Sequence, residues 1–528
     1  MDVAKKRSLE IPLTIDNYET AFAFIEQCLR RNHIKDDKAI TETNLLFEAI
    51  LNNLIEQGYD QNTTLTIKVK KSFGEIYIKL GFEGKSYVPE DTKQDGVSPE
   101  LKMIQVYNDK ISYRYQMGYN SIRVVVKRNY RSSLMHCALG ALLAILTYIL
   151  MITFMSEDQQ LAFDNTIISP LIKQFANAMM MVGAPVTLFS LVKNLTDIYI
   201  VSEMNSSGKK LQMKTIATSV IAIVLALVTS VFASGLINTH AGYLGTENII
   251  TAGIPSFDFI SSMVPSSIFE PFQTYMPFPM IIVALLITYA FCSIGKYFDV
   301  MQRVIDICYT LFSRMLKVVM FTLPFFFFLS IITSLLEDGF EDLILMARFI
   351  AAVLLSLIVI FAFYLIRLLI GGVRIIPFIK HLMPLIWENI KINSAIDAVP
   401  FNIRYCAKEY KYDLKRLSEK LPILAQTNLD GNCFLITLVS MLFIFLLGIE
   451  ISWLHIIAIA ILVLFLSLGA PNQPGSMLIG ILIITFFLQA DDLIVVAIYA
   501  EVFFGTLQNI INVIGDIVTV AIEEQKSV

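Results

Sequence analysis

The chain has 528 residues, of which 55% are hydrophobic and only 16% are charged, and its mean hydropathy is +0.64. This balance excludes an ordinary soluble globular protein, yet it leaves more charge than membrane spans alone would carry, so we expect a soluble part joined to a membrane part. The net charge of −4 indicates little about partners, because most of the surface of the membrane part should face lipid.

Residues 1–130 are predicted to form a small cytosolic α/β sandwich. The first residues lack the apolar core of a secretory signal peptide, which favours the cytosol. Apolar residues recur at helical spacing in residues 16–32 and 43–56, and residues 98–107 suggest a further helix. Period-two patterns predict strands at residues 64–69, 75–80, 110–115 and 121–127.

The order of these elements resembles the histidine-kinase-like ATPase superfamily, especially its small anti-sigma-factor kinases. Residues 48–52, followed by Gln57-Gly58-Tyr59, resemble the helix that carries the metal-binding Asn of that family, and residues 98–128 resemble its C-terminal helix and strand pair. In place of the Asp that reads adenine stands Phe82, which cannot accept a hydrogen bond. We therefore expect a degenerate domain that binds no ATP and serves as a regulatory module with a cytosolic protein partner; a plain packing domain is the alternative.

Apolar runs of membrane-spanning length dominate the chain from residue 131 onward. Lys127, Arg128 and Arg131 directly precede the first run, which favours a cytoplasmic N-terminus. We predict spans at residues 133–155, 168–193, 211–237, 275–295, 304–336 and 342–371. Between residues 375 and 522 the runs are shorter and interrupted by Gly and Pro, a pattern that indicates a transporter site.

Two acidic residues lie inside the interrupted region, Asp430 at the start of one apolar run and Asp516 late in the last one. An Asp at the centre of a membrane helix costs about 3 kcal/mol, so it normally faces a polar cavity, an ion or a partner. Each has a neighbouring Asn, Asn428 or Asn512, and these carboxylate and amide oxygens suit Na⁺ or a proton. The alternative is that both Asp residues cap helices at loop ends.

These motifs, in this order, resemble the dicarboxylate/amino acid:cation symporter family, the glutamate-transporter-like proteins, over most of residues 133–522. Residues 420–431 resemble its LPLGATxNMDGT motif, residues 512–516 its NVxGD motif, residues 473–475 the tip of its second hairpin, and residues 218–219 a Thr-Ser pair on its third helix. The resemblance implies a multi-pass α-helical membrane protein with eight transmembrane helices and two re-entrant hairpins. It also implies a homotrimer in the cell inner (plasma) membrane.

The resemblance further implies a membrane domain over residues 131–525, with a scaffold at about 131–371 and a transport core at about 372–522. One cation site would contain Asn428, Asn512 and Asp516, and the other Thr218, Ser219 and Asp430. The implied solute site, gated by the two hairpin tips, comprises Ser394, Gln473, Pro474, Gly475, Gly505, Gln508, Asn509 and Asn512.

The chain departs from the family where the substrate is held. The family's Asp for a substrate amino group and Arg for a side-chain carboxylate are replaced by Gly505 and Gln508. An amide cannot supply the charge of a bidentate Arg, so aspartate and glutamate are not expected as substrates, and a neutral or otherwise unusual solute is favoured. Lys214 suggests a second departure: its ammonium could pair with Asp430 in place of Na⁺, or it could extend to the membrane interface.

The sequence therefore predicts a secondary active symporter for a small organic solute, an amino acid or carboxylate, coupled to Na⁺ or H⁺ by an elevator-type motion. The alternative is a transporter-derived ligand sensor that signals through the N-terminal domain. An enzyme is not expected, because no nucleophile–base set is visible and the six cysteines are scattered without a CxxC pair. Nothing in the sequence indicates binding to nucleic acid.

Overall fold

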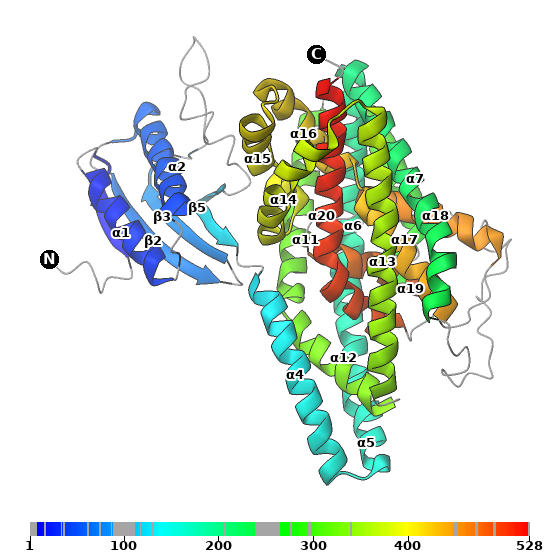
Figure 1. Ribbon diagram of the computed structural model, residues 1–528. Helices are drawn as coiled ribbons and strands as arrows, with labels where there is room; N and C mark the ends of the chain where they lie inside the picture. The colour runs from blue at the N-terminus through cyan, green and yellow to red at the C-terminus, as the bar shows by residue number, and fades with distance from the viewer. Residues whose placement is uncertain are drawn as a thin grey trace. The chain divides into compact units, whose positions relative to one another are not determined.

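A computed structural model of the protein is shown in Figure 1. It describes residues 8–14, 17–32, 34, 37–60, 63–72, 75–85, 87, 111–116, 118–128, 131–204, 206–237, 264–274, 277–293, 297–337, 340–446, 452–469, 474–488 and 493–525. The chain divides into two compact units, residues 1–132 and residues 133–528. Each unit has its own hydrophobic core.

The N-terminal unit contains a five-stranded antiparallel sheet with the strand order β1-β2-β3-β5-β4. Its elements are β1 (Leu9–Pro12), α1 (Tyr18–Arg31), α2 (Asp37–Glu56), β2 (Thr64–Ser72), β3 (Glu75–Glu83), β4 (Ile111–Gln116) and β5 (Tyr119–Arg128). Strand β1 was not predicted, because four residues that end in a proline give too short an alternation. The helix expected at residues 98–107 lies outside the described residues.

One face of the sheet is buried because alternate residues of the strands are apolar. In the paired strands β3 and β5, Ile78 lies opposite Val124 and Leu80 opposite Ile122, and all four side chains are buried. Helix α1 packs against α2 and β2, and α2 packs against β5. These contacts bury the apolar stripe of each helix, as its helical spacing requires.

Aromatic rings gather where β3 ends. Phe82, which the sequence comparison places at the position of an adenine-reading Asp as an expectation only, contacts the rings of Tyr59 and Tyr87 edge to face. The Tyr87 hydroxyl donates a 2.9 Å hydrogen bond to Asn53 Oδ1, and the Tyr87 amide donates to Asn120 Oδ1 at 2.9 Å. Burial raises the pKa of Tyr87 well above its usual range. Both polar groups of Tyr87 thus bind protein side chains, whereas the buried Asn53 Nδ2 has no hydrogen-bond partner.

The membrane unit is helical. Its elements are α4 (Arg131–Phe154), α5 (Glu157–Phe163), the π-helix η4 (Asp164–Ile168), α6 (Ser169–Met204), α7 (Ser206–Ile237), α9 (Glu270–Thr274), α10 (Pro277–Ser293), α11 (Phe298–Met320), α12 (Leu323–Glu337), α13 (Phe340–Ile370), α14 (Ile375–Ile392), α15 (Ala395–Tyr405), the π-helix η6 (Cys406–Tyr410), α16 (Leu414–Thr427), α17 (Asp430–Leu446), α18 (Trp453–Gly469), α19 (Ser476–Leu488) and α20 (Leu493–Gln525). Among the described residues, six helices are long and apolar enough to cross a membrane, or seven if one bent pair forms a single span. The expected total of eight spans remains a prediction.

The bent pair consists of α11 and α12, which meet at an angle of 47°. The sequence predicted a span over residues 304–336, and that span stays a prediction, because the apolar pair is bent at its middle. Pro324 lies in the first turn of α12, where proline is tolerated, but α11 could not continue through it, because proline has no N–H to donate and its ring would clash with the preceding turn. The apolar pattern continues through the break, which is why hydropathy alone did not reveal it.

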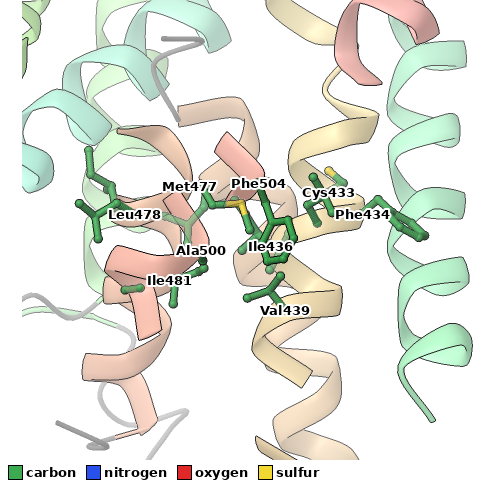
Figure 2. Packing of buried hydrophobic residues seen from close by; sticks show 14 of the residues in the cluster. Cys433, Phe434, Ile436, Val439, Met477, Leu478, Ile481, Ala500 and Phe504 are labelled. Atoms are coloured by element: carbon green, nitrogen blue, oxygen red, sulfur yellow. The ribbon is translucent and has the colours of Figure 1, made fainter. Parts of the chain in front are cut away.

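Two helical hairpins pack against the last helix. The first consists of α14 and α15, the second of α18 and α19, and α20 contacts α14, α15 and α19. Helix α17 is buried nearly all round and packs against α7, α13, α19 and α20. Figure 2 shows Met477 of α19, Ile436 of α17 and Phe504 of α20 facing one another in this core. Helices α7 and α13 precede the predicted scaffold–core boundary near residue 371, so helices from both predicted parts surround α17.

Candidate functional site

The site is built around a break between α16 and α17. Asn428 ends α16 with the non-helical angles φ −95° and ψ 86°, and Asp430 begins α17. Both side chains are fully buried. The break leaves backbone groups without hydrogen-bond partners in their own helix. It also places the Asp430 carboxylate in the first turn of α17, where the helix dipole favours a negative charge.

Asp430 receives hydrogen bonds from two other helices. The Ser219 hydroxyl of α7 donates to its Oδ1 at 3.2 Å. The Tyr364 hydroxyl of α13 lies 3.4 Å from its Oδ2 and 3.3 Å from the Ile511 carbonyl oxygen, and can donate to either. Arg367, one turn further along α13, places Nη1 3.7 Å from Asp430 Oδ2. Sequence reasoning missed Tyr364 and Arg367; the signal was an arginine inside an otherwise apolar span.

Lys214 does not approach Asp430. Its side chain is half exposed, and Nζ forms an ion pair with Glu523 near the end of α20. The hypothesis of a Lys214–Asp430 pair is therefore wrong. Lys214 lies more than one helical turn before Ser219 on α7 and on a different face of the helix from Ser219, whose hydroxyl contacts Asp430.

Asp516 and Asn428 join the two predicted cation sites. Asn428 Nδ2 donates to Asp516 Oδ1 at 2.9 Å, while the Thr218 hydroxyl donates to Asn428 Oδ1 at 3.3 Å. Asn512 Oδ1 accepts the backbone N–H of Gly431 at 2.8 Å, and so caps α17. We call the six buried residues predicted as cation ligands the polar cluster: Thr218, Ser219, Asn428, Asp430, Asn512 and Asp516.

The polar cluster depends on the close approach of α17 and α20. A Cβ at Gly515 would lie 2.8 Å from Asn428 Nδ2 and 2.9 Å from the Tyr364 hydroxyl oxygen. A Cβ at Gly431 would lie 2.4 Å from the carbonyl oxygen of Gln508. Both distances are shorter than real side chains allow, so glycine at these two positions lets the acidic residues share hydrogen-bond partners.

The predicted solute-binding residues of α20 reach both hairpin tips. Gln508 Nε2 donates to Ser476 Oγ of the second hairpin at 3.3 Å, and Asn509 Nδ2 lies 3.2 Å from Asn393 Oδ1 of the first. Ser394 is buried and N-caps α15 by accepting the backbone N–H of Asp397. The buried Gln508 Oε1 and Asn509 Oδ1 have no hydrogen-bond partner. These two free acceptors, beside residues of both hairpins, can receive the N–H or O–H groups of a solute.

A buried carboxylate that sequence reasoning missed holds the second hairpin. Glu501 Oε1 accepts the N–H of Gly475 at 2.7 Å, and Oε2 accepts the N–H of Leu478 at 3.1 Å. Gly505, one turn later, leaves room, since a Cβ there would lie 2.8 Å from Glu501 Oε1. Of the other residues predicted for this tip, Pro474 is half-buried and Gln473 lies outside the described residues.

Comparisons with known proteins give one result for the membrane unit. A family model described as the sodium:dicarboxylate symporter family matches residues 133–525. No curated protein matches the chain. The matched range contains every residue of the polar cluster and both hairpins, whereas the N-terminal unit lies outside it.

Proposed function

Because the chain belongs to the sodium:dicarboxylate symporter family, we propose that it moves a small organic solute across the membrane, coupled to Na⁺ or H⁺, by an elevator-type motion. Members of this family are transporters rather than enzymes. The chain is accordingly a multi-pass membrane protein with a small-molecule solute and the lipid bilayer as partners.

The Asp516 carboxylate carries the coupling proposal. It is buried, and its hydrogen-bond donor is the neutral Asn428 amide. Among the described residues, no Lys or Arg forms an ion pair with it. A buried carboxylate without a counter-charge is costly, and a proton or Na⁺ would remove that cost. The Asn428 amide that contacts Asp516 also carries an oxygen, and this oxygen and the Thr218 hydroxyl bound to it are hard neutral ligands of the kind that suit Na⁺.

The hairpin tips favour a neutral or amine-bearing solute over a dicarboxylate. The hydrogen-bond partners of Gln508 and Asn509 are the neutral side chains of Ser476 and Asn393. The backbone N–H groups at the second tip, which are suited to an anion, already bind the Glu501 carboxylate. An anionic solute would meet this negative charge, whereas an ammonium or amide N–H would find acceptors.

The proposal extends to the assembly and its placement. We propose a homotrimer in the cell inner (plasma) membrane, with the N-terminal unit in the cytosol. Large apolar side chains stay exposed on helices of the membrane unit, Leu142, Phe154, Phe232 and Ile358 among them, which suits contact with lipid or with other subunits. The basic residues before α4 support the orientation.

A sensor is the second candidate function. Glu501 fills the anion-binding groups of the second hairpin with a group of the protein itself, and the membrane unit is preceded by a separate unit with its own core. Both observations suit a ligand-binding core that signals through the N-terminal unit rather than one that transports.

Uptake into proteoliposomes distinguishes the two candidates. The purified full chain would be tested with radiolabelled neutral amino acids, amides, amines and dicarboxylates, with and without an inward Na⁺ or H⁺ gradient. We expect gradient-driven uptake of a neutral or amine-bearing solute that is lost in Asp516→Asn and retained in the control Asp158→Asn, whose side chain is exposed on α5. Stabilisation of the protein by a solute without any uptake would instead support the sensor.

A further inference from the structure

We infer that Arg367 is a resident counter-ion of Asp430, a fixed guanidinium that takes the place of a transported cation at that carboxylate. The inference rests on the proposed function, because only a transporter has a coupling ion, but the ion pair itself is a property of the structure. The polar cluster thus contains two different carboxylates: the charge of Asp430 is neutralised by a side chain of the protein, and the charge of Asp516 is not.

The Asp430 carboxylate needs a positive charge because it is fully buried. Its hydrogen bonds from Ser219 and Tyr364 are long, at 3.2 and 3.4 Å, and come from neutral hydroxyls. Hydroxyl groups stabilise a buried carboxylate only in part, and a full opposite charge is normally required. Arg367 supplies that charge from 3.7 Å, and arginine keeps its proton in proteins.

The structure fixes the position of the Arg367 side chain. Nη2 donates a 2.9 Å hydrogen bond to the Thr519 hydroxyl of α20, and the guanidinium lies 5.5 Å from the centre of the Phe363 ring. Nη1 is buried and makes no hydrogen bond, so no other acceptor competes with Asp430 for its positive charge. One side chain thus links α13, α17 and α20.

A cation that approached Asp430 would meet the guanidinium within a few ångströms. The pair Asp430–Arg367 already has zero net charge, so a further cation would create an uncompensated positive charge in a buried site. Asp516 differs, because the amide of Asn428 leaves its negative charge in place. A coupling ion is therefore directed to Asp516.

The test counts the Na⁺ ions linked to the stability of the purified full chain. The thermal unfolding midpoint would be measured against Na⁺ concentration, with choline keeping ionic strength constant, because the slope reports the number of bound ions. We expect Arg367→Gln, which removes the charge but keeps a donor for Thr519, to bind about one Na⁺ more than wild type. The double variant Arg367→Gln/Asp430→Asn should return to the wild-type number. Arg348→Gln, an exposed position on the same helix, is the control.

An unchanged number of Na⁺ ions in Arg367→Gln would overturn the inference. If that variant does not fold, Asp430→Asn in the wild-type background decides: an unchanged number supports the inference, and the loss of one ion overturns it. The ion count does not depend on uptake, so a failure of the proposed transport activity would be seen separately, as the absence of gradient-driven flux in wild type.

Discussion

Three buried carboxylates of the membrane unit are stabilised by three different kinds of partner. Asp430 faces a guanidinium, Asp516 an amide, and Glu501 the backbone N–H groups of a hairpin tip. The partner determines what each group can do, since a carboxylate with a fixed counter-charge or fixed donors has little need of a ligand. Of these three carboxylates, Asp516 is the one that keeps a charge that an incoming cation can neutralise.

Removing the Glu501 carboxylate should loosen the second hairpin. In Glu501→Ala the buried N–H groups of Gly475 and Leu478 lose their acceptor, at a cost of about 1–3 kcal/mol each. We expect a lower thermal unfolding midpoint, with a smaller decrease in Glu501→Gln, which keeps an acceptor oxygen. The control is Glu388→Ala, an exposed residue paired with Lys391. Equal midpoints for Glu501→Ala and wild type would contradict this role.

At the scale of elements, the site results from interrupted helices that pack closely. The break between α16 and α17 presents Asn428 and Asp430, α7 and α13 supply hydroxyls and the guanidinium, and α20 carries Asp516. The two hairpins meet α20 through Gln508 and Asn509. Side chains that are far apart in the sequence therefore share hydrogen-bond partners because the helices that carry them pack side by side.

A methyl group at the contact of α17 and α20 should disrupt cation binding. Gly515→Ala would place Cβ 2.8 Å from Asn428 Nδ2, so the amide must move away from Asp516. We expect Na⁺ or H⁺ affinity, measured by cation-dependent thermal stabilisation, to fall at least about tenfold, which corresponds to about 1.4 kcal/mol. Gly235→Ala on α7 is the matched control, because a Cβ there meets no atom within 4 Å. Wild-type affinity in Gly515→Ala would show that the close packing does not matter for the ion.

The sequence predicted the members of the polar cluster but not all of their partners. Asn and Asp within interrupted apolar runs are rare, and their cost made them visible. Arg367 and Glu501 carry the same signal, yet each stands alone in a long apolar run, and periodicity does not tell which neighbouring helix a side chain faces. The hypothesis that Lys214 pairs with Asp430 failed for the same reason, and the alternative, a side chain that extends to the membrane interface, stays a prediction. The bend at Pro324 was not predicted because the apolar pattern continues through it. Strand β1 was not predicted because four residues are too few to show a period-two pattern.

At the scale of the whole molecule, the chain combines two units with separate cores and separate chemistry. The membrane unit belongs to a known transporter family, and the N-terminal unit lies outside the matched range. In the N-terminal unit, buried tyrosines hydrogen-bond to Asn side chains, as Tyr18 does to Asn52 and Tyr87 to Asn53. The stability of this unit should therefore depend on the protonation of its buried tyrosines.

Alkaline pH should destabilise the N-terminal unit. Burial, reinforced by the charge of Glu48, raises the pKa of Tyr18 to about 12, and burial raises that of Tyr87 further. An unfolded tyrosine has a pKa of about 10, so the stability from these groups is complete below about pH 10 and declines as pH rises above it. Pulses of protease on the full chain, corrected for protease activity at each pH, should cleave residues 8–128 faster above that pH.

Tyr87→Phe separates this effect from general alkaline damage. The variant loses the hydrogen bond to Asn53, about 1 kcal/mol, at neutral pH, but it should show a weaker increase in cleavage above pH 10. The control is Tyr115→Phe, at an exposed tyrosine of β4. The same pH profile in Tyr87→Phe and wild type would exclude Tyr87 as a source of the alkaline sensitivity.

The measurement that tests the account most directly is the solute flux of the reconstituted protein under opposed gradients. Proteoliposomes would hold a fixed gradient of the transported solute while an opposing Na⁺ or H⁺ gradient is varied. The account predicts that net flux stops and reverses at a defined cation gradient, and that Asp516→Asn abolishes this reversal. Solute flux that follows its own gradient whatever the cation gradient, or no flux at all, would contradict a cation-coupled transporter.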